Sequence, residues 1–523
     1  MTDLMRTLRR NLTLWITLAV LAVLFVLALQ GMGPQDWVIT LLRGLSVGAL
    51  TFLVASGFSL IFGLLDVLNL AHGTLFMIGA YIGWTVFVRP DTFVDLITPL
   101  ALLAAGFALM PLWDRLVQAG GLPARFRRAW PWLGLLAAIG VLALALPRYP
   151  LRIWSTTAYD QSPVTYAFLA DQGQYSLPGP VPFSGASSAV VLGGILLGSL
   201  LAALSLAGLA HRRGGPMAAA NRRLPRLPIA AGLGLVILGL AVFAFNAPLA
   251  SALHSLNTTW LFLIAMLVTA LTGAGLGALM ESILIRPLYS RPIYQLMLTL
   301  GLSAIGIEMV WAVWGRPEFT MPSPAIFNGS GPGCPAKSLA DLLARQCSTI
   351  SILGGRVRTY NEVFIPLVGL AVLAGIWLLL QRTRLGMVIR AGVQDREMVE
   401  ALGINVRRVF TLVFALGVGL AALGGVLAGP SMGLSSVMGD NLLLNVLIAL
   451  AIGGLTSFPG AAVGSLLVGM IQQFIIKYGQ IGIHLPFLAE PFKPTPPLVP
   501  ASTVMLMVII LLILPQGLFG RKE

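Results

Sequence analysis

Polar side chains that could contact a small solute gather in one short stretch of an otherwise apolar chain. Residues 61–73, IFGLLDVLNLAHG, place Asp66, Asn69 and His72 beside glycines. A carboxylate, an amide and an imidazole together offer hydrogen-bond donors and acceptors to a polar ligand. An interrupted apolar segment survives inside a bilayer only where it is buried in protein or lines a cavity. We therefore favour a place on a path across a membrane over the alternative, a tight turn between two spans.

Other interruptions and buried charges are few. Residues 453–460, GGLTSFPG, break a later apolar stretch, and a tight turn and a site on the path fit them equally well. Glu308 lies within an apolar segment, where a carboxylate is costly and usually functional, so it is a second candidate for the path. Glu281 precedes Arg286 by about a turn and a half, which favours a structural ion pair near the inner interface.

A polar, charged stretch at residues 382–408 predicts a short helix that contacts another protein. Asp395 can cap its start, because a carboxylate accepts the unpaired N–H groups of a first helical turn. Gly403 occupies the position of a left-handed C′ residue, with Ile404 placed for the hydrophobic contact that often follows. Apolar residues at helical spacing form a small face between them: Met398, Val399 and Leu402. An ordinary basic loop is the competing interpretation.

Several kinds of chemistry have no residues to carry them. The chain has no G-x-x-x-x-G-K-[ST] phosphate loop with which to bind ATP. It has no H-E-x-x-H, and its four histidines lack metal-ligand spacing: His72, His211, His254 and His484. We expect no catalytic residue, no metal and no cofactor. Any energy that the chain uses therefore comes from a partner.

The elements that position these residues are membrane helices. Of 523 residues, 57% are hydrophobic and 10% are charged, a composition typical of a polytopic membrane protein. Because backbone groups in lipid must pair internally, we predict an all-α transmembrane helical bundle. Windows of about 20 apolar residues give roughly fourteen spans: near 12–30, 37–63, 72–88, 93–113, 129–147, 187–210, 228–246, 259–285, 293–314, 363–381, 409–430, 440–455, 461–478 and 500–519.

The charge distribution predicts the orientation of the chain and not a nucleic-acid ligand. The formal net charge is +14, but the arginines cluster in short loops beside apolar spans, as the positive-inside rule requires. With both termini in the cytoplasm, every arginine cluster falls on the inner side. The N-terminal basic and apolar run resembles a signal peptide, yet it lacks a clear cleavage site and is long enough to span, so we interpret it as the first span.

The only two cysteines, Cys334 and Cys347, share one polar loop that this topology places on the outer side. A disulfide between them is expected in an oxidising compartment and would contribute about 3 kcal/mol by loop closure. Two free thiols remain the alternative.

Four stretches together resemble one family: GFSLIFGLLDVLNLAHGTLFMIGAY at 57–81, ESILIRPLYSRP at 281–292, TRLGMVIRAGVQDREMVEALGIN at 383–405 and FALGVGLAALGGVLAGP at 414–430. The chain resembles the permease subunits of high-affinity branched-chain amino acid ABC transporters. The resemblance implies an ATPase-coupling helix at 393–405, with Asp395, Glu400, Ala401 and Gly403 as its coupling residues. It also implies a translocation path through Asn69, Ala71, His72 and Gly73, to which we add Asp66, Thr74 and Glu308.

The chain departs from the family in two respects. Thr74 stands where relatives often carry Glu, which weakens a specific assignment to leucine, isoleucine or valine. Residues 89–257 are an insertion with about four spans and no assigned chemistry. The expected organisation is therefore an N-terminal span at 1–36, a first part of the permease core at 37–88, the insertion, and a second part of the core at 258–523.

The resemblance implies a permease subunit of an ATP-binding cassette importer in a bacterial inner membrane, carrying amino acids, branched-chain ones first, or related small solutes. Its expected partners are ABC ATPase subunits, a second related permease, a periplasmic substrate-binding protein and membrane lipid, and no nucleic acid. The alternative is a stand-alone secondary transporter or channel for a small neutral solute such as urea or an amide. A membrane anchor for other subunits would leave the interrupted segments unexplained.

Overall fold

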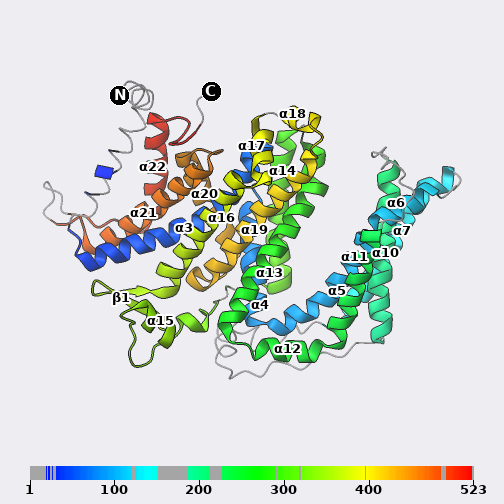
Figure 1. Cartoon of the computed structure of the whole chain (residues 1–523), viewed down its shortest axis with the longest axis horizontal. Helices are drawn as coiled ribbons and strands as arrows, with labels where there is room; N and C mark the ends of the chain where they lie inside the picture. Colours follow the sequence, from blue (N-terminus) through cyan, green and yellow to red (C-terminus); the bar gives the residue numbers. More distant parts are fainter. Residues whose placement is uncertain are drawn as a thin grey trace. The chain divides into compact units, whose positions relative to one another are not determined.

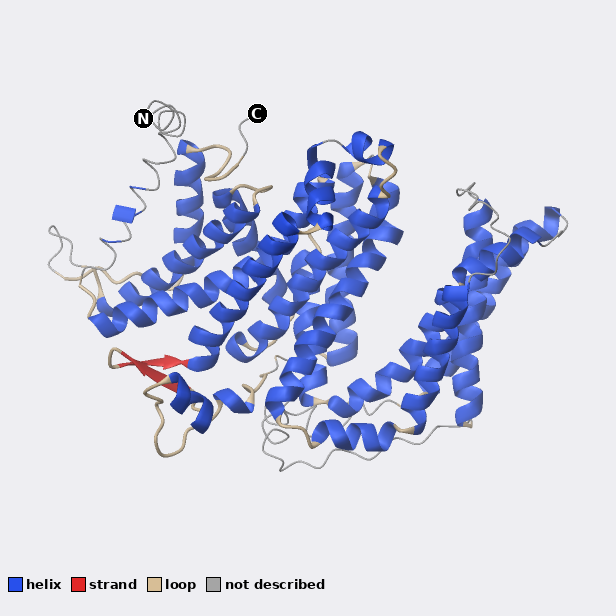
Figure 2. Cartoon of the chain, in the orientation of Figure 1, coloured by secondary structure: helices blue, strands red, loops and turns tan. Residues whose placement is uncertain are grey.

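The computed structural model describes residues 31–119, 124–150, 187–212, 226–289, 291–316, 318, 320–394, 396–483 and 490–520, with residues 19, 22, 23 and 26. The described chain is almost wholly helical, so the predicted all-α fold is confirmed (Figure 2). Ten of its helices are long and apolar enough to cross a membrane, and three shorter apolar helices accompany them. These thirteen match all the predicted windows except 12–30, which lies outside the described residues apart from four isolated positions.

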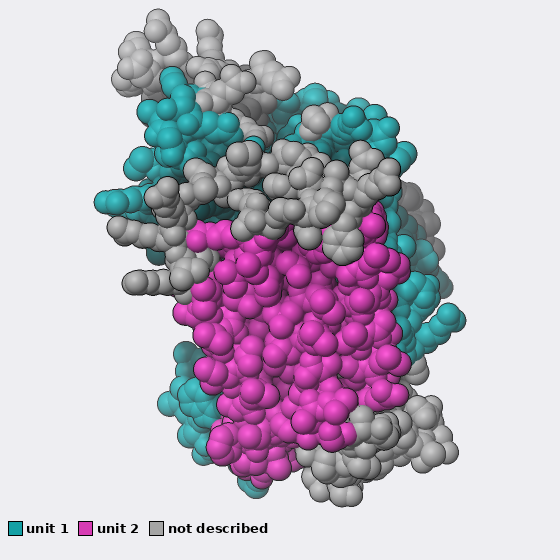
Figure 3. Space-filling model, turned by 90° about the vertical axis from the view of Figure 1, so that its right-hand side faces the viewer, with its two compact units in different colours: residues 1–84, 257–523 teal, residues 85–256 magenta. Residues whose placement is uncertain are grey.

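The chain divides into two units, residues 1–84 with 257–523, and residues 85–256 (Figure 3). The limits of the second unit lie close to those of the predicted insertion, 85 against 89 and 256 against 257. This unit holds four of the candidate spans. Its described α-helices are α5 (Pro90–Ala108), α6 (Met110–Ala119), α7 (Ala124–Ala145), α10 (Ser188–Arg212), α11 (Arg226–Ala244) and α12 (Asn246–His254).

The second unit has its own core and a buried ion pair. Apolar side chains of α5, α7 and α10 pack around Ile195 and Tyr149. The Arg89 guanidinium donates to both carboxylate oxygens of Asp91, from Nε at 3.1 Å and Nη2 at 3.0 Å. Both side chains are almost fully buried, so the pair is a structural feature of the start of α5, where removal of the Arg89 charge would leave a buried carboxylate without this partner.

The first unit contains the other helices. In chain order its α-helices are α3 (Pro34–Leu65), α4 (His72–Val88), α13 (Thr258–Leu279), α14 (Pro292–Trp314), α15 (Leu339–Arg345), α16 (Ile365–Arg382), α17 (Arg384–Gln394), α18 (Arg396–Ala401), α19 (Val406–Met432), α20 (Met438–Gly453), α21 (Phe458–Ile481) and α22 (Leu498–Ile513) (Figure 1). A short hairpin of β1 (Thr349–Ile352) and β2 (Gly355–Arg358) pairs antiparallel. The hairpin and α15 lie at the opposite end of the unit from α17 and α18, and we call these the outer and the inner end.

The helices of this unit form two halves that run in opposite directions. Near its start α3 contacts the outer end through an ion pair of Arg43 with Glu362 (2.9 Å). Its last residues pack at the inner end against an apolar cluster that contains Val399 of α18 and Phe410 of α19. α19 runs the other way, from that inner cluster to Gly429, which contacts the outer loop. Each is followed by an interruption and a shorter apolar helix, α4 or α20.

The next long helix of each half packs against the first helix of the other half. α21 packs against α3, and α13 packs against α19. The pattern is typical of inverted-topology repeats in transporters. The 85–256 unit occupies the connection between α4 and α13, within the first half.

Glycines allow the close approach of these helices. Gly57 of α3 and Gly417 of α19 touch backbone to backbone, and a Cβ on Gly57 would overlap the Gly417 carbonyl. Ser46 lies in a Gly44-x-Ser46-x-Gly48 pattern that resembles a hydrolase motif. In this fold the pattern is part of a continuous helix, and its two glycines contact Met470 and Leu466 of α21. Small residues at helix interfaces stabilise membrane bundles through van der Waals packing.

Residues 453–460, for which the sequence left two interpretations, form the tight turn between α20 and α21. Gly454 has φ of +108°, and the Ser457 hydroxyl accepts from the Gly460 N–H at 3.2 Å to cap α21. Backbone groups of the C-terminal residues Leu518 and Phe519 donate to Ile452 and Gly453. These two backbone hydrogen bonds therefore stabilise the turn from residues 518 and 519.

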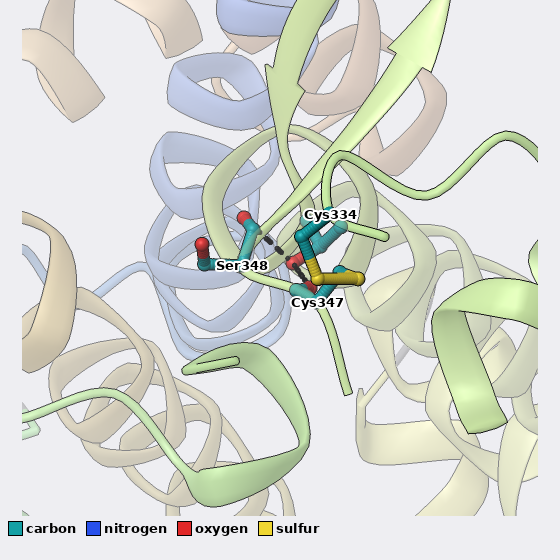
Figure 4. The surroundings of a disulfide bond; sticks show 4 residues. Cys334, Cys347 and Ser348 are labelled. Atoms are coloured by element: carbon teal, nitrogen blue, oxygen red, sulfur yellow. Dashed lines mark hydrogen bonds between the residues drawn. A yellow bond between two sulfur atoms is a disulfide. The ribbon is translucent and has the colours of Figure 1, made fainter. Parts of the chain in front are cut away.

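At the outer end, Cys334 and Cys347 form a disulfide, with Cα atoms 5.6 Å apart. The Thr359 hydroxyl donates to the carbonyls of Cys347 and Ser348, both at 3.0 Å (Figure 4). The cystine packs into a small core with Ile350 and Val357 of the hairpin. Ile39 and Leu42 of α3 contact this core, so the disulfide loop is fixed to the start of α3.

Replacement of Gly57 by Val should destabilise the protein because the new side chain has no space against Gly417. Overpacking of a tight interface typically destabilises by about 1–3 kcal/mol. The matched control is Gly375→Val in α16, where a Cβ meets no atom within 4 Å. Thermal unfolding of the purified variants, followed by tryptophan fluorescence, should show a lower Tm for Gly57→Val only. An equal fall in both would contradict the packing argument.

Candidate functional site

The interruption after α3 turns the chain back into the bundle. α3 ends at Leu65, and Asp66 takes the left-handed conformation (φ 53°) while its N–H donates to the Phe62 carbonyl at 2.9 Å. The Nε2 atom of His72, the first residue of α4, lies 3.2 Å from the Val54 carbonyl. Val54 precedes Leu65 by eleven residues, which is about 16 Å along a helix. Residues 66–71 therefore return from the inner end of α3 to a level well inside the bundle.

Side chains take over the hydrogen bonds that a helix would have made in this segment. The Leu70 N–H donates to the Thr299 hydroxyl of α14 at 3.3 Å. The Ala71 N–H donates to Asn69 Oδ1 at 3.1 Å, and the His72 N–H to the Asn69 carbonyl at 3.1 Å. Unpaired backbone groups are costly away from water. Asn69 and Thr299 therefore make the interruption possible, and no local sequence pattern marks Thr299 for this role.

Two polar atoms of this segment have no partner among the described residues, although both side chains are buried: Asn69 Nδ2 and His72 Nδ1. Since Asn69 Oδ1 accepts from Ala71, its Nδ2 is the amide nitrogen, a donor. The Val54 carbonyl can only accept, so His72 Nε2 donates, and in a neutral ring Nδ1 is an acceptor. An unmet donor and an unmet acceptor thus lie three residues apart. Each such group typically destabilises the buried state by about 1–3 kcal/mol.

The residues that follow pack against α14 and α20. The hydroxyls of Thr74 and Ser303 are 2.5 Å apart. Gly73 touches the backbone of Gly439, and a Cβ on either glycine would overlap the carbonyl of the other. The first turns of α4 and α20 therefore meet without any side chain between them.

The structure brings some of the predicted path residues together and leaves others apart. Asn69, His72, Gly73 and Thr74 are buried in one continuous region between α3, α14 and α20. Asp66 and Glu308 are exposed, and neither forms a hydrogen bond or ion pair with this group within the described part of the chain. The sequence missed Asp440, an exposed acidic residue in the first turn of α20. It begins an apolar window, which is why it was not counted as intramembrane.

The predicted helix in the polar stretch is present as α18, and its C-terminus has the geometry expected from the sequence. Gly403 has φ of +79°. Its N–H donates to the Glu400 carbonyl at 3.0 Å, and the Ile404 N–H donates to the Val399 carbonyl at 3.4 Å. This pair of bonds is a Schellman motif. Asp395, the predicted N-cap, lies outside the described residues.

α18 presents one side to the bundle and another to its surroundings. Of the predicted apolar face, only Val399 is buried, at 2% exposure, whereas Met398 and Leu402 are 60% and 73% exposed. Glu400, Ala401 and Gly403 are also exposed. Val399 lies in one apolar cluster with Phe410 of α19, and Leu64 and Leu65 of α3 pack against that cluster. α18 is thus attached to the end of α3 from which residues 66–71 depart.

A buried carboxylate beside this apolar cluster accepts four hydrogen bonds from three side chains. Glu281 has no exposed surface, and Arg286 donates to both its carboxylate oxygens, from Nε at 3.1 Å and Nη2 at 2.7 Å. The hydroxyls of Tyr289 (2.5 Å) and Thr411 (2.7 Å) also donate to Glu281. Residues 280–285 form a π-helix, whose i→i+5 bonding places Glu281 and Arg286 on one side. The predicted structural ion pair is therefore confirmed, and Tyr289 joins it to Phe410 by an edge-on contact at 5.8 Å.

Comparison with known proteins gives a consistent family. A family model described as "Branched-chain amino acid transport system / permease component" matches residues 40–172 and 227–515. The permease protein LivH of the high-affinity branched-chain amino acid transport system of Salmonella typhimurium is 26% identical over 271 residues, 51% of this chain and 78% of that protein.

Two further relatives match shorter parts of the chain. The corresponding protein BraD of Pseudomonas aeruginosa is 31% identical over 174 residues, 33% of this chain and 52% of BraD. The fructose import permease protein FruF of Bifidobacterium longum is 32% identical over 124 residues, 22% of this chain and 34% of FruF. No solved structure matches the chain.

The Glu281 cluster predicts unequal effects of two substitutions. Glu281→Ala leaves the Arg286 guanidinium without its carboxylate, a change that typically destabilises by about 3 kcal/mol. Tyr289→Phe removes one of four hydrogen bonds and should destabilise by about 1 kcal/mol. Thermal unfolding of the purified variants should therefore show the larger fall in Tm for Glu281→Ala. Similar falls would mean that the ion pair does not dominate the cluster.

Proposed function

This chain belongs to the family of permease components of branched-chain amino acid transport systems, and from that premise we propose that it is a membrane-spanning subunit of an ABC importer. In this proposal separate ATPase subunits supply the energy, a second related permease completes the membrane part, and a periplasmic binding protein delivers the solute. The proposed location is a bacterial inner membrane, because the permease relatives from Salmonella typhimurium and Pseudomonas aeruginosa come from bacteria.

The observation that carries the proposal is the attachment of an exposed helix to the start of the interrupted segment. α18 exposes Met398, Glu400 and Leu402 at the inner end, and its Val399 belongs to the apolar cluster against which the end of α3 packs. A partner that gripped the exposed side of α18 would move the end of α3 with it, because packed side chains transmit displacement. Residues 66–71 begin at that end, so movement there changes the path. Glu400, Ala401 and Gly403, together with Asp395, are the proposed coupling residues.

The proposed path passes the region of Asn69, His72, Gly73 and Thr74. Its buried atoms without a partner are groups that a passing polar solute or water could satisfy. We propose an amino acid as the solute, branched-chain ones first, by analogy with LivH and BraD. The likeness to a fructose permease means that the family alone does not fix the solute.

Purification of the chain from native membranes in mild detergent tests the proposal. We expect ATPase subunits to co-purify, and the reconstituted complex to accumulate L-leucine in proteoliposomes only with ATP and the binding protein. Accumulation by the chain alone on an ion gradient would instead establish a stand-alone secondary transporter. Among the described residues no group of three or more acidic, histidine or cysteine side chains could hold a metal coupling ion.

Changes in α18 should uncouple transport without preventing membrane insertion. Glu400→Arg reverses an exposed charge, and Gly403→Pro cannot adopt φ of +79° and removes the N–H that donates to Glu400. Each should reduce ATP-driven uptake at least tenfold and weaken co-purification of the ATPase. The matched control is Arg384→Glu, another exposed charge reversal at the start of α17. Unchanged uptake in both α18 variants would exclude it as the coupling helix.

A further inference from the structure

The two short helices of the opposed halves begin at the same place. α4 begins at His72 and α20 at Met438, and their second residues, Gly73 and Gly439, touch backbone to backbone. Each helix start follows an interruption, at 66–71 and at 433–437. Both interruptions of the inverted halves therefore converge on one point, which we call the junction.

The junction lies near the middle of the membrane-crossing length of the bundle. α19 has 27 residues, about 40 Å of helix. Its Gly425 lies against the Phe76 backbone of α4, about 28 Å from the start of α19 and about 10 Å from its end. Gly73 precedes Phe76 by three residues, about 4.5 Å further toward the inner end. The first turn of α20 is therefore distant from both ends of α19.

The first turn of α20 exposes polar side chains at this level. Asp440 and Asn441 are both exposed, and Leu444, one turn further along, is 55% exposed on the same side. Among the described residues, none forms a hydrogen bond or ion pair with the Asp440 carboxylate. The next residue, Asn445, accepts a hydrogen bond from the Gln472 side chain of α21 at 3.1 Å. A carboxylate in contact with lipid at this depth is strongly unfavourable, so this side of α20 faces water or a polar partner.

On the buried side of the junction, by contrast, the available groups favour a negatively charged ligand group. The first turns of α4 and α20 carry the positive ends of two helix dipoles. The buried Asn69 amide nitrogen, a donor without a partner among the described residues, lies in the interruption that leads into α4. The junction thus combines groups that favour an anion with an exposed carboxylate that favours a cation.

We propose that the junction is the solute-contact site of the path and that it takes an α-amino acid as the zwitterion. Asp440 accepts hydrogen bonds from the α-ammonium group, Asn441 lines the same water-filled side, and Asn69 with the two helix starts receives the α-carboxylate when the path opens. This inference rests on the proposed function, because it assigns the place where the transported solute meets the chain.

Water access to Asp440 can be tested independently of transport. The sequence has only two cysteines, and both are in the disulfide, so an introduced cysteine is the one free thiol of the chain. We would treat Asp440→Cys and Asn441→Cys in the whole complex with a cationic methanethiosulfonate, which reacts with the ionised thiol in contact with water. The control is Leu267→Cys in α13, a position 61% exposed on an apolar side. Modification is measured as a mass shift of this chain.

We expect at least tenfold faster modification at residues 440 and 441 than at 267, with L-leucine and the binding protein slowing the reaction at 440. Equal rates at all three positions would overturn the proposal, since Asp440 would then not face water. Fast reaction without protection by L-leucine would also overturn it, because the site would be wet but not in contact with solute.

The charge requirement is tested by uptake of L-leucine. Asp440→Asn keeps the shape of the side chain but removes the charge, and should lower uptake at least tenfold, whereas Asp440→Glu should recover part of it. The matched control is Glu490→Gln, which neutralises an exposed carboxylate in the loop before α22, outside the junction and the predicted path. Unchanged uptake for Asp440→Asn would contradict the assignment.

Co-purification of the ATPase distinguishes a failure of the junction proposal from a failure of the proposed function. If ATPase subunits remain bound to the Asp440 variants and wild-type uptake is normal, a negative result falls on the junction alone. If wild-type chain binds no ATPase, the proposed function itself has failed.

Discussion

Backbone hydrogen bonding in a medium without water is the constraint on which the rest of the structure depends. Most of the chain satisfies it with continuous helices, which need no help from side chains. Residues 66–71 do not, and three donors there bond instead to Thr299 and Asn69. These hydrogen bonds, which replace those of a helix, hold an extended segment inside an apolar bundle. The hydrogen bonds that keep the segment in this conformation therefore come from two parts of the chain, the segment itself and α14.

The same segment begins where the bundle is attached to its inner surface helix. Leu64 and Leu65, the last residues of α3, lie in one apolar cluster with Val399 of α18 and Phe410 of α19. Beside it, the buried Glu281 joins three hydrogen-bond donors from two helices. An apolar cluster and a satisfied polar cluster side by side make a rigid connection. Such a connection favours movement of α18 and the end of α3 as one body.

Small residues set how closely the opposed halves can approach. Contacts between glycine backbones occur at Gly57 with Gly417 and at Gly73 with Gly439. The first contact joins two long helices, and the second joins two helix starts. Because no side chain intervenes, either contact leaves little room for adjustment. The two halves therefore meet at these glycine contacts. The polar groups of the interruptions lie at the second contact, where α4 and α20 begin.

The sequence by itself determined the class of the protein, the helix windows in its described part, the Schellman end of α18 and the Glu281–Arg286 ion pair. Each follows from local physical rules: apolar length, a left-handed glycine or a charge pair close in sequence. The tertiary structure alone decided that Thr299 supports the interruption, that Asp440 stands exposed beside Gly73, and that residues 453–460 are a turn. The first two relations join residues hundreds of positions apart, and the turn is held by residues 518 and 519. No local pattern encodes which distant segment fills a given space.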